Sequence, residues 1–269
     1  MKSLFLPDHD AFVRWHEMGK TGPAIVYLAG LGMPAVDNFL AVASHPALRE
    51  TRALMIDLLG AGSSDRPATY AHTLENHAQC IAAVLDHLGT GPCTLVGYSM
   101  GGSISVALAL ARPDLVARLV VAEGNLIPGG GNASRHIAAQ SEAEFTAKGL
   151  PGMLGELRTA ALAGEEFKGF VHSAWSQVDP RGLYGNARML VDLPLDFADR
   201  FLALEIPRWF VYGANNLSAA SAAPSPDLPD PGVLKSRGVA IAVVAGVGHE
   251  MMLGNPDGFA EVLGAVINR

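Results

Sequence analysis

The chain has 269 residues, of which 49% are hydrophobic and 17% are charged, so it can bury a sizeable core and differs from disordered chains, which are poor in hydrophobic residues. Its formal net charge is -7, and no cluster of lysine and arginine interrupts that balance, which argues against a nucleic-acid partner. Proteins of this length and composition often form one main domain, which is our starting assumption.

Hydropathy and cysteine content indicate which kind of protein this is and where it is located. The uninterrupted apolar runs are too short to span a bilayer, and the polar start of the chain lacks the apolar stretch of a signal peptide, so we expect a cytoplasmic protein that does not insert into a membrane. Cys80 and Cys93 have no His or second Cys at ligand spacing, so we expect buried, reduced thiols rather than a disulfide or a metal site. The sequence leaves a homo-oligomer open.

The predicted elements alternate between strands and helices along the chain. The segment 12–17 alternates like a half-exposed strand and predicts an antiparallel edge. Apolar runs without alternation, typical of strands buried on both faces of a parallel sheet, lie at 24–29, 53–58, 93–98, 117–122, 208–213 and 239–245. Helical patterns separate them at 74–88, 101–111 and 259–267. This order predicts an α/β fold with a mostly parallel central sheet flanked by helices.

The alternation lapses between about 125 and 200, where short helices joined by Gly and Pro are predicted at 142–149, 152–162 and 187–190. We interpret residues 126–200 as a small helical cap, inserted after the strand that ends near Glu123 into a core made of 1–125 and 201–269. The proline-rich segment 215–231 is hostile to helix and central strand and predicts an exposed loop.

The run Gly-Tyr-Ser-Met-Gly at 97–101 stands between a predicted strand and a predicted helix. In that context Gly-x-Ser-x-Gly is typical of a nucleophile elbow, a sharp turn that holds the Ser99 hydroxyl away from the backbone. A serine nucleophile needs a base within hydrogen-bond reach, and His249 follows the apolar run 239–245 directly. We therefore predict Ser99 as the nucleophile and His249 as its base.

Together these features resemble the α/β-hydrolase fold superfamily over essentially the whole chain. The elbow and the His249 loop carry the resemblance, and 57–64 resembles the family's Asp-x-x-Gly-x-Gly-x-Ser turn. That turn is chiefly structural in the family, so we expect Asp57 to accept hydrogen bonds from nearby backbone N–H groups.

The loop after the strand 24–29 departs from the family pattern. Many relatives have a His-Gly pair there, whereas this chain has Ala29 before Gly30. Because the oxyanion hole of the family uses backbone N–H groups, this change removes no donor. The resemblance implies Met100 and Leu31 as the two donors, with a flexible turn lacking any ligand role as the alternative for the loop.

The acid that orients the histidine is the second departure. In most relatives it is an Asp three residues after the Gly that ends the strand 208–213, and here that position holds Asn216. Some relatives, haloalkane dehalogenases among them, place the acid after the preceding strand, where this chain has Glu123. We predict Glu123 as the acid and Asn216 as a neutral orienter of His249, with Asp227 and Asp230 as rival acids.

The predicted chemistry is acyl transfer to water through an acyl-enzyme on Ser99, with a small carboxylic ester as substrate and no metal or organic cofactor. We expect Gly30, Trp175 and Met189 to line the substrate pocket. The same constellation serves C–C bond, lactone and amide hydrolysis, and these alternatives stay open. A function of another class, a small-molecule-binding receptor with little turnover, stays open as well.

Overall fold

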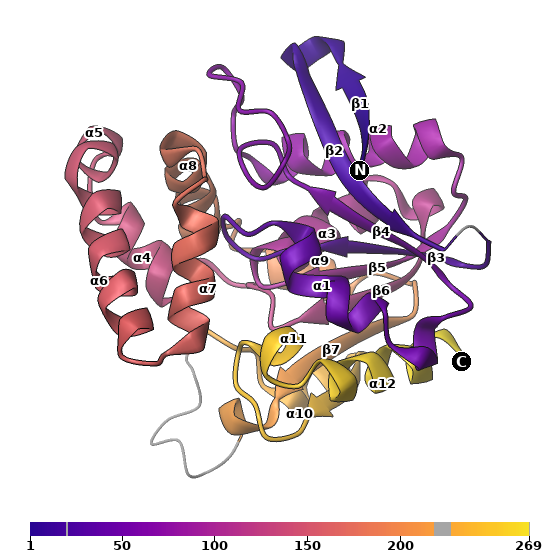
Figure 1. The fold of residues 1–269 in the computed structure, drawn as a ribbon. Helices are drawn as coiled ribbons and strands as arrows, with labels where there is room; N and C mark the ends of the chain where they lie inside the picture. The colour runs from indigo at the N-terminus through magenta and orange to yellow at the C-terminus, as the bar shows by residue number, and fades with distance from the viewer. Residues whose placement is uncertain (20, 218–226, 269) are drawn as a thin grey trace.

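The computed structural model describes residues 1–19, 21–217 and 227–268 and contains one eight-stranded sheet in the order β1-β2-β4-β3-β5-β6-β7-β8. The strands are β1 (Lys2–Leu6), β2 (Ala11–Met18), β3 (Ala24–Leu28), β4 (Arg52–Asp57), β5 (Cys93–Tyr98), β6 (Val116–Ala122), β7 (Arg208–Gly213) and β8 (Ala240–Val244). β1 and β2 are antiparallel to their neighbours, and all pairs from β4 to β8 are parallel (Figure 1). The predicted α/β fold with a mostly parallel sheet is therefore confirmed.

The six predicted parallel strands are confirmed, and each bound differs from the prediction by at most one residue. The strand predicted at 12–17 is β2, whose side chains alternate in burial. β1 was not predicted, because most of its side chains are exposed and it carries no apolar pattern. It forms the antiparallel edge by pairing with β2.

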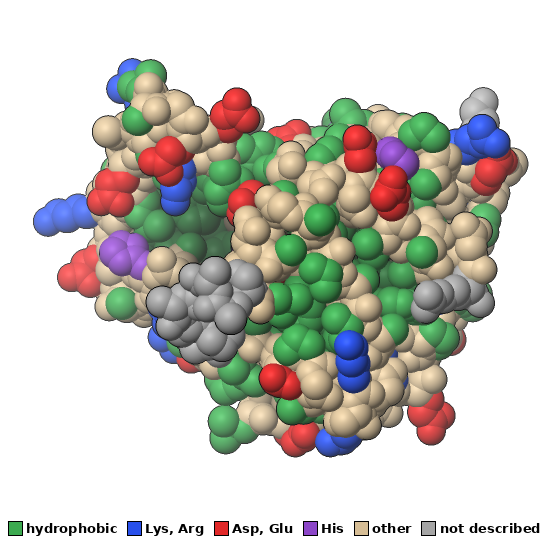
Figure 2. All heavy atoms as spheres, turned by 90° about the horizontal axis from the view of Figure 1, so that it is seen from below, with side chains coloured by type: hydrophobic (Ala, Val, Ile, Leu, Met, Phe, Trp, Pro, Cys, Tyr) green, Lys and Arg blue, Asp and Glu red, His purple; other side chains and the backbone are tan. Residues whose placement is uncertain are grey.

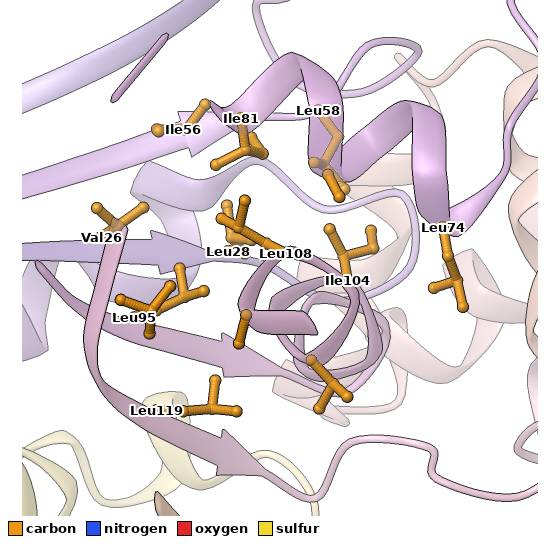
Figure 3. Packing of buried hydrophobic residues seen from close by; sticks show 14 of the residues in the cluster. Val26, Leu28, Ile56, Leu58, Leu74, Ile81, Leu95, Ile104, Leu108 and Leu119 are labelled. Carbon is orange, nitrogen blue, oxygen red and sulfur yellow. The ribbon is translucent and has the colours of Figure 1, made fainter. Parts of the chain in front are cut away.

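Side chains of the parallel strands alternate between two hydrophobic cores, one on each face of the sheet. α2 (Leu74–Leu88) and α3 (Met100–Ala111) cover one face, where Leu95 and Leu119 pack beneath Ile104 and Leu108 (Figure 3). α1 (Ala35–Ala43), α11 (Met251–Gly254) and α12 (Pro256–Ile267) cover the other face. Truncating one of the fully buried leucines to Ala is expected to remove about 2–5 kcal/mol of folding free energy.

Helices fill the chain between β6 and β7, and most of them stand beside the sheet (Figure 1). They are α4 (Asn132–Ala138), α5 (Glu142–Glu144), a π-helical turn (Phe145–Gly149), α6 (Leu150–Leu162), α7 (Glu166–Trp175), α8 (Pro180–Val191) and α9 (Phe197–Leu202). The last of them, α9, packs instead against α3 and the core on that face of the sheet. The helices predicted at 142–149 and 152–162 are present, and the one predicted at 187–190 is the end of the longer α8. The division into core and cap stays a prediction.

The predicted loop 215–231 lies only partly within the described residues, because 218–226 are outside them. A single 3₁₀ turn (Ala214–Asn216) follows β7, and α10 (Pro231–Ser236) follows the loop. In the part of the chain that the structure describes, no helix combines the length and the apolar character needed to cross a membrane. Cys80 and Cys93 are buried and free, as predicted.

Candidate active site

Ser99 occupies the turn between β5 and α3 with φ 52° and ψ -120°, a conformation that non-glycine residues rarely adopt. Its backbone N–H donates to Ala122 O at 2.9 Å, and its carbonyl accepts from the N–H of Gly102 at 2.9 Å. A Cβ at Gly97 would overlap the carbonyl of Gly101, so the strand and the helix can cross this closely only without side chains there. The Ser99 side chain is thereby held at the amino end of α3.

Two backbone N–H groups near Ser99 are free to bind an anionic oxygen. Met100 begins α3, and Leu31 lies in the loop after β3. Neither amide donates a hydrogen bond to any acceptor in the described part of the chain, whereas the neighbouring Gly30 N–H points to Asn38 Oδ1 at 3.4 Å. Leu31 also lines the same cavity as Ser99. Free N–H donors beside a nucleophile are what an oxyanion hole requires.

His249 stands in the loop after β8, and its ring lies 4.9 Å from the ring of Tyr98, the residue before Ser99. The loop is tied to the end of β7, because Asn215 N–H donates to Val247 O at 2.9 Å. Burial raises the pKa of Tyr98, and the nearby Glu123 raises it further, so its hydroxyl stays neutral. His249 and Ser99 line one cavity together, although no hydrogen bond between their side chains exists among the described residues.

Glu123 follows the last residue of β6 with φ 44°, and its side chain is fully buried. Its Oε2 lies 2.8 Å from Nδ1 of His249. Its Oε1 accepts the backbone N–H of Gly213 at 2.8 Å, and Asn216 Nδ2 lies 2.9 and 2.8 Å from Oε1 and Oε2. A buried carboxylate is costly without such donors, and this one has three.

The structure corrects the predicted contact of Asn216. We expected a hydrogen bond to His249, but the amide donates to Glu123 instead, because the ends of the adjacent parallel strands β6 and β7 bring these two side chains together. The rival acids are engaged elsewhere. Asp227 pairs with Arg135 at 2.6 Å, and Asp230 accepts the N–H of Val233 at 2.9 Å as the N-cap of α10. Glu123 therefore lies against His249, and neither Asp does.

Asp57 behaves as the sequence predicts. Its buried carboxylate accepts the backbone N–H groups of Ala35 at 2.7 Å and Ser63 at 2.8 Å, which holds the turn after β4 against the start of α1. Burial raises the pKa of Asp57, and these two hydrogen bonds oppose that rise. The residue is structural.

A cavity of about 490 Å³ opens over Ser99 and His249. Gly30 and Trp175 line it, together with apolar side chains of α6 and α7, among them Met153, Leu157, Phe167 and Val171. In Figure 2 a hollow with hydrophobic walls opens between the helices at the left and the rest of the molecule. Met189 was predicted to line the pocket and does not, because it lies on the side of α8 that packs against the core.

Trp175 of α7 also contacts the loop after β3. Its indole N–H donates to Leu31 O at 2.9 Å, and a Cβ at Gly32, where φ is +69°, would lie 2.9 Å from the indole nitrogen. α7 thus holds the peptide next to a candidate oxyanion donor. Sequence reasoning placed Trp175 at the pocket but missed this contact, because no motif indicates the acceptor of an indole N–H.

The structure also brings residues to the site that sequence reasoning passed over. Asn125, two residues after Glu123, lines a second cavity that reaches Ser99, and Asn132, Ala133 and His136 of α4 line the first. No motif marked them. Among the described residues, no three His, Cys, Asp or Glu side chains gather in an arrangement that could hold a metal ion.

A family model for the alpha/beta hydrolase fold matches residues 23–165, more than half of the chain. The sn-1-specific diacylglycerol lipase ABHD11 of Mus musculus is 36% identical over 155 residues, which are 57% of this chain and 48% of that protein. The 2-hydroxy-6-oxononadienedioate/2-hydroxy-6-oxononatrienedioate hydrolase of Burkholderia vietnamiensis is 34% identical over 132 residues, which are 48% of this chain and 44% of that protein. The matched part spans about half the length of these curated relatives.

Solved structures resemble the chain over nearly its full length. A thermophilic esterase from Thermogutta terrifontis has a TM-score of 0.79 at 19% identity, and the match includes 100% of this chain and 98% of the esterase. The enol-lactonase from Burkholderia xenovorans has a TM-score of 0.79 at 18% identity and full coverage of both chains. At these identities the likeness shows the fold.

Proposed function

Since the chain belongs to the α/β-hydrolase family, we propose that it is a serine hydrolase that cleaves a small carboxylic ester through an acyl-enzyme on Ser99. One observation carries the proposal. Ser99, on a strained turn, shares a cavity with His249, and the Nδ1 of that histidine lies 2.8 Å from a buried glutamate. This arrangement supports Ser99 as nucleophile, His249 as base and Glu123 as acid, the three roles that acyl transfer needs.

The hydrogen bonds of Glu123 define the histidine's role. A carboxylate can only accept, so the proton between the two side chains belongs to Nδ1 of His249 and leaves Nε2 as the base. Nε2 takes the proton of the Ser99 hydroxyl as Oγ attacks the ester carbonyl. The imidazolium formed in this step faces the Glu123 carboxylate, which stabilises it.

The carbonyl oxygen becomes negative in the tetrahedral intermediate. The N–H groups of Met100 and Leu31 bind it, and the amino end of α3 adds its positive dipole. His249 then protonates the leaving alcohol, and the acyl group stays on Ser99. Water attacks the acyl-enzyme with His249 again as base, which releases the acid and restores the hydroxyl.

We propose the helices of residues 126–200 as the cap over this site, with 1–125 and 201–269 as the core. Their apolar side chains line the larger cavity, which suits the apolar part of an ester. The names of the relatives include a lipase, a hydrolase of 2-hydroxy-6-oxononadienedioate, an esterase and a lactonase, so the bond cleaved is the part of the proposal that most needs measurement.

Labelling with a fluorophosphonate tests the proposal. The probe phosphonylates an activated serine, so the protein should label on the peptide that contains Ser99, and Ser99→Ala should not label. Ser103→Ala is a matched control, because that buried hydroxyl donates to Asn125 O and lies on the helix after the elbow. Folded protein that does not label contradicts the hydrolase and favours the receptor. A turnover screen of esters, lactones and amides then identifies the bond.

A further inference from the structure

Two cavities meet at the candidate catalytic residues. The larger, of about 490 Å³, extends between the cap helices, and the smaller, of about 330 Å³, extends toward the ends of β6 and β7. Both are lined by Leu31, Ser99 and His249. An ester whose carbonyl carbon lies at Ser99 therefore has space for one half of the molecule in each cavity.

The smaller cavity is lined by several polar side chains that do not line the larger one. Three of these are already engaged: Asn216 donates to Glu123, Ser134 Oγ donates to Gly131 O at 3.0 Å, and Asp227 pairs with Arg135. These side chains hold the walls of the cavity in place. They are occupied before any substrate enters.

Asn125 differs from these three. It is 9% exposed, and its backbone carbonyl accepts the hydroxyl of Ser103 at 2.7 Å, which anchors the main chain at this point. Its carboxamide has no hydrogen-bond partner within the described residues, although the residue lines the smaller cavity together with Ser99. The carboxamide atoms of Asn125 are not among the fully buried polar atoms that lack a partner in the described residues. From the wall of the cavity this side chain can both donate and accept a hydrogen bond.

We infer, on the basis of the serine-hydrolase function proposed above, that Asn125 is a specificity-determining residue whose carboxamide hydrogen-bonds to the substrate. The substrate is an ester with two unlike halves. An apolar chain lies in the larger cavity, and a short hydroxylated group lies in the smaller one against Asn125. A site built to pair a substrate hydroxyl discriminates against the analogue that lacks it, because its own buried polar group is then left unpaired.

Two pairs of esters of equal chain length test this inference. One pair, 2,3-dihydroxypropyl octanoate and propyl octanoate, differs in hydroxyls on the alcohol. The other, octyl 2,3-dihydroxypropanoate and octyl propanoate, differs in hydroxyls on the acid. We expect the protein to prefer the hydroxylated member of at least one pair by about 10-fold or more in kcat/KM.

Asn125→Leu keeps the branched shape of the side chain and removes its hydrogen-bonding groups. It should abolish that preference by lowering kcat/KM for the hydroxylated ester about 10-fold or more, while the unsubstituted ester changes by less than about threefold. Leu228→Val, in the same cavity, is the matched control and should keep the preference. Asn125→Ala is measured in parallel in case the leucine does not fit.

The results separate this inference from the proposed function. Absence of fluorophosphonate labelling at Ser99 contradicts the hydrolase itself. Labelling and ester turnover without a preference for either hydroxylated ester overturn only the role of Asn125, and so does a preference that both Asn125 variants retain.

Discussion

The amide of Asn216 donates to the carboxylate of Glu123, at 2.9 and 2.8 Å from its two oxygens, and not to His249. In the proposed mechanism Glu123 is the acid, and Asn216, at the position where the family resemblance leads us to expect an acid, donates to it. β6 and β7 pair in parallel, so their carboxyl ends lie side by side and either end can present a side chain to the histidine loop. Under the proposed function, the acid that orients His249 follows β6 instead of β7.

Glu123→Gln should lower kcat by about 10³–10⁴-fold with little change in folding, because a neutral amide neither stabilises the imidazolium nor holds the same tautomer of His249. Steady-state kinetics with a p-nitrophenyl ester and a thermal melt measure the two effects.

Two controls accompany this variant. Asn216→Ala removes hydrogen bonds to the carboxylate but leaves its charge, so we expect a loss of about 10-fold. Asp227→Asn breaks the pair with Arg135 and should leave kcat within about threefold. A larger loss of kcat in Asp227→Asn than in Glu123→Gln would indicate that the acid is Asp227 in the proline-rich loop and not Glu123.

The neighbouring strand ends also predict a rescue. Asn216 already lies against the carboxylate that contacts His249, so an Asp at 216 should supply a charge to the same histidine. The double variant Glu123→Gln, Asn216→Asp should regain about 10-fold or more of the kcat that Glu123→Gln loses. A double variant that is no faster than the single one means that position 216 cannot reach the histidine in this chain.

Trp175→Phe removes the indole N–H that holds Leu31 O at 2.9 Å. The peptide next to the Leu31 amide loses a support, so we expect kcat to fall about 10-fold and fluorophosphonate labelling to slow in proportion. Phe167→Leu, on the same helix and in the same cavity, changes only apolar contact and should act mainly on KM. If Trp175→Phe also acts only on KM, the indole contributes packing and no positioning.

His77 makes stability depend on pH. It is fully buried on α2, with Nδ1 3.2 Å from the Tyr70 hydroxyl and Nε2 2.8 Å from Asn186 Oδ1, and burial lowers its pKa to about 3. In the unfolded chain, where the His pKa is about 6.5, this residue binds a proton that it does not bind in the folded state. Lowering the pH from 6.5 to 4.5 should therefore reduce the free energy of unfolding by about 2 kcal/mol.

Urea unfolding at pH 6.5, 5.5 and 4.5 measures that loss. His77→Gln, which can keep both hydrogen bonds, should show a smaller fall in unfolding free energy than the unaltered chain. His87→Gln, at an exposed position on the same helix, is the control and should keep the original slope. Equal slopes in all three proteins would contradict the assignment to His77.

The strands and the ends of the strands at the site could be predicted, because strands covered on both faces carry apolar runs without alternation. The positions after β5, β6 and β8 follow directly from them. The cap was harder. Met189 and Leu190 are neighbours on α8, yet only Leu190 lines a cavity at the site, since successive residues on a helix point about 100° apart. The hydrogen-bond partner of Asn216 could not be predicted either, because it depends on how the side chains that follow β6 and β7 pack against each other.

The proposed function requires that an acyl group forms on Ser99. The most direct measurement is the mass of the protein after brief incubation with p-nitrophenyl acetate and acid quenching, followed by peptide mapping. We predict one added acetyl group on the peptide that contains Ser99, its loss with longer incubation, and no such group in Ser99→Ala. Ester turnover by folded protein with no acyl group on Ser99, or with unchanged turnover in Ser99→Ala, would contradict the account.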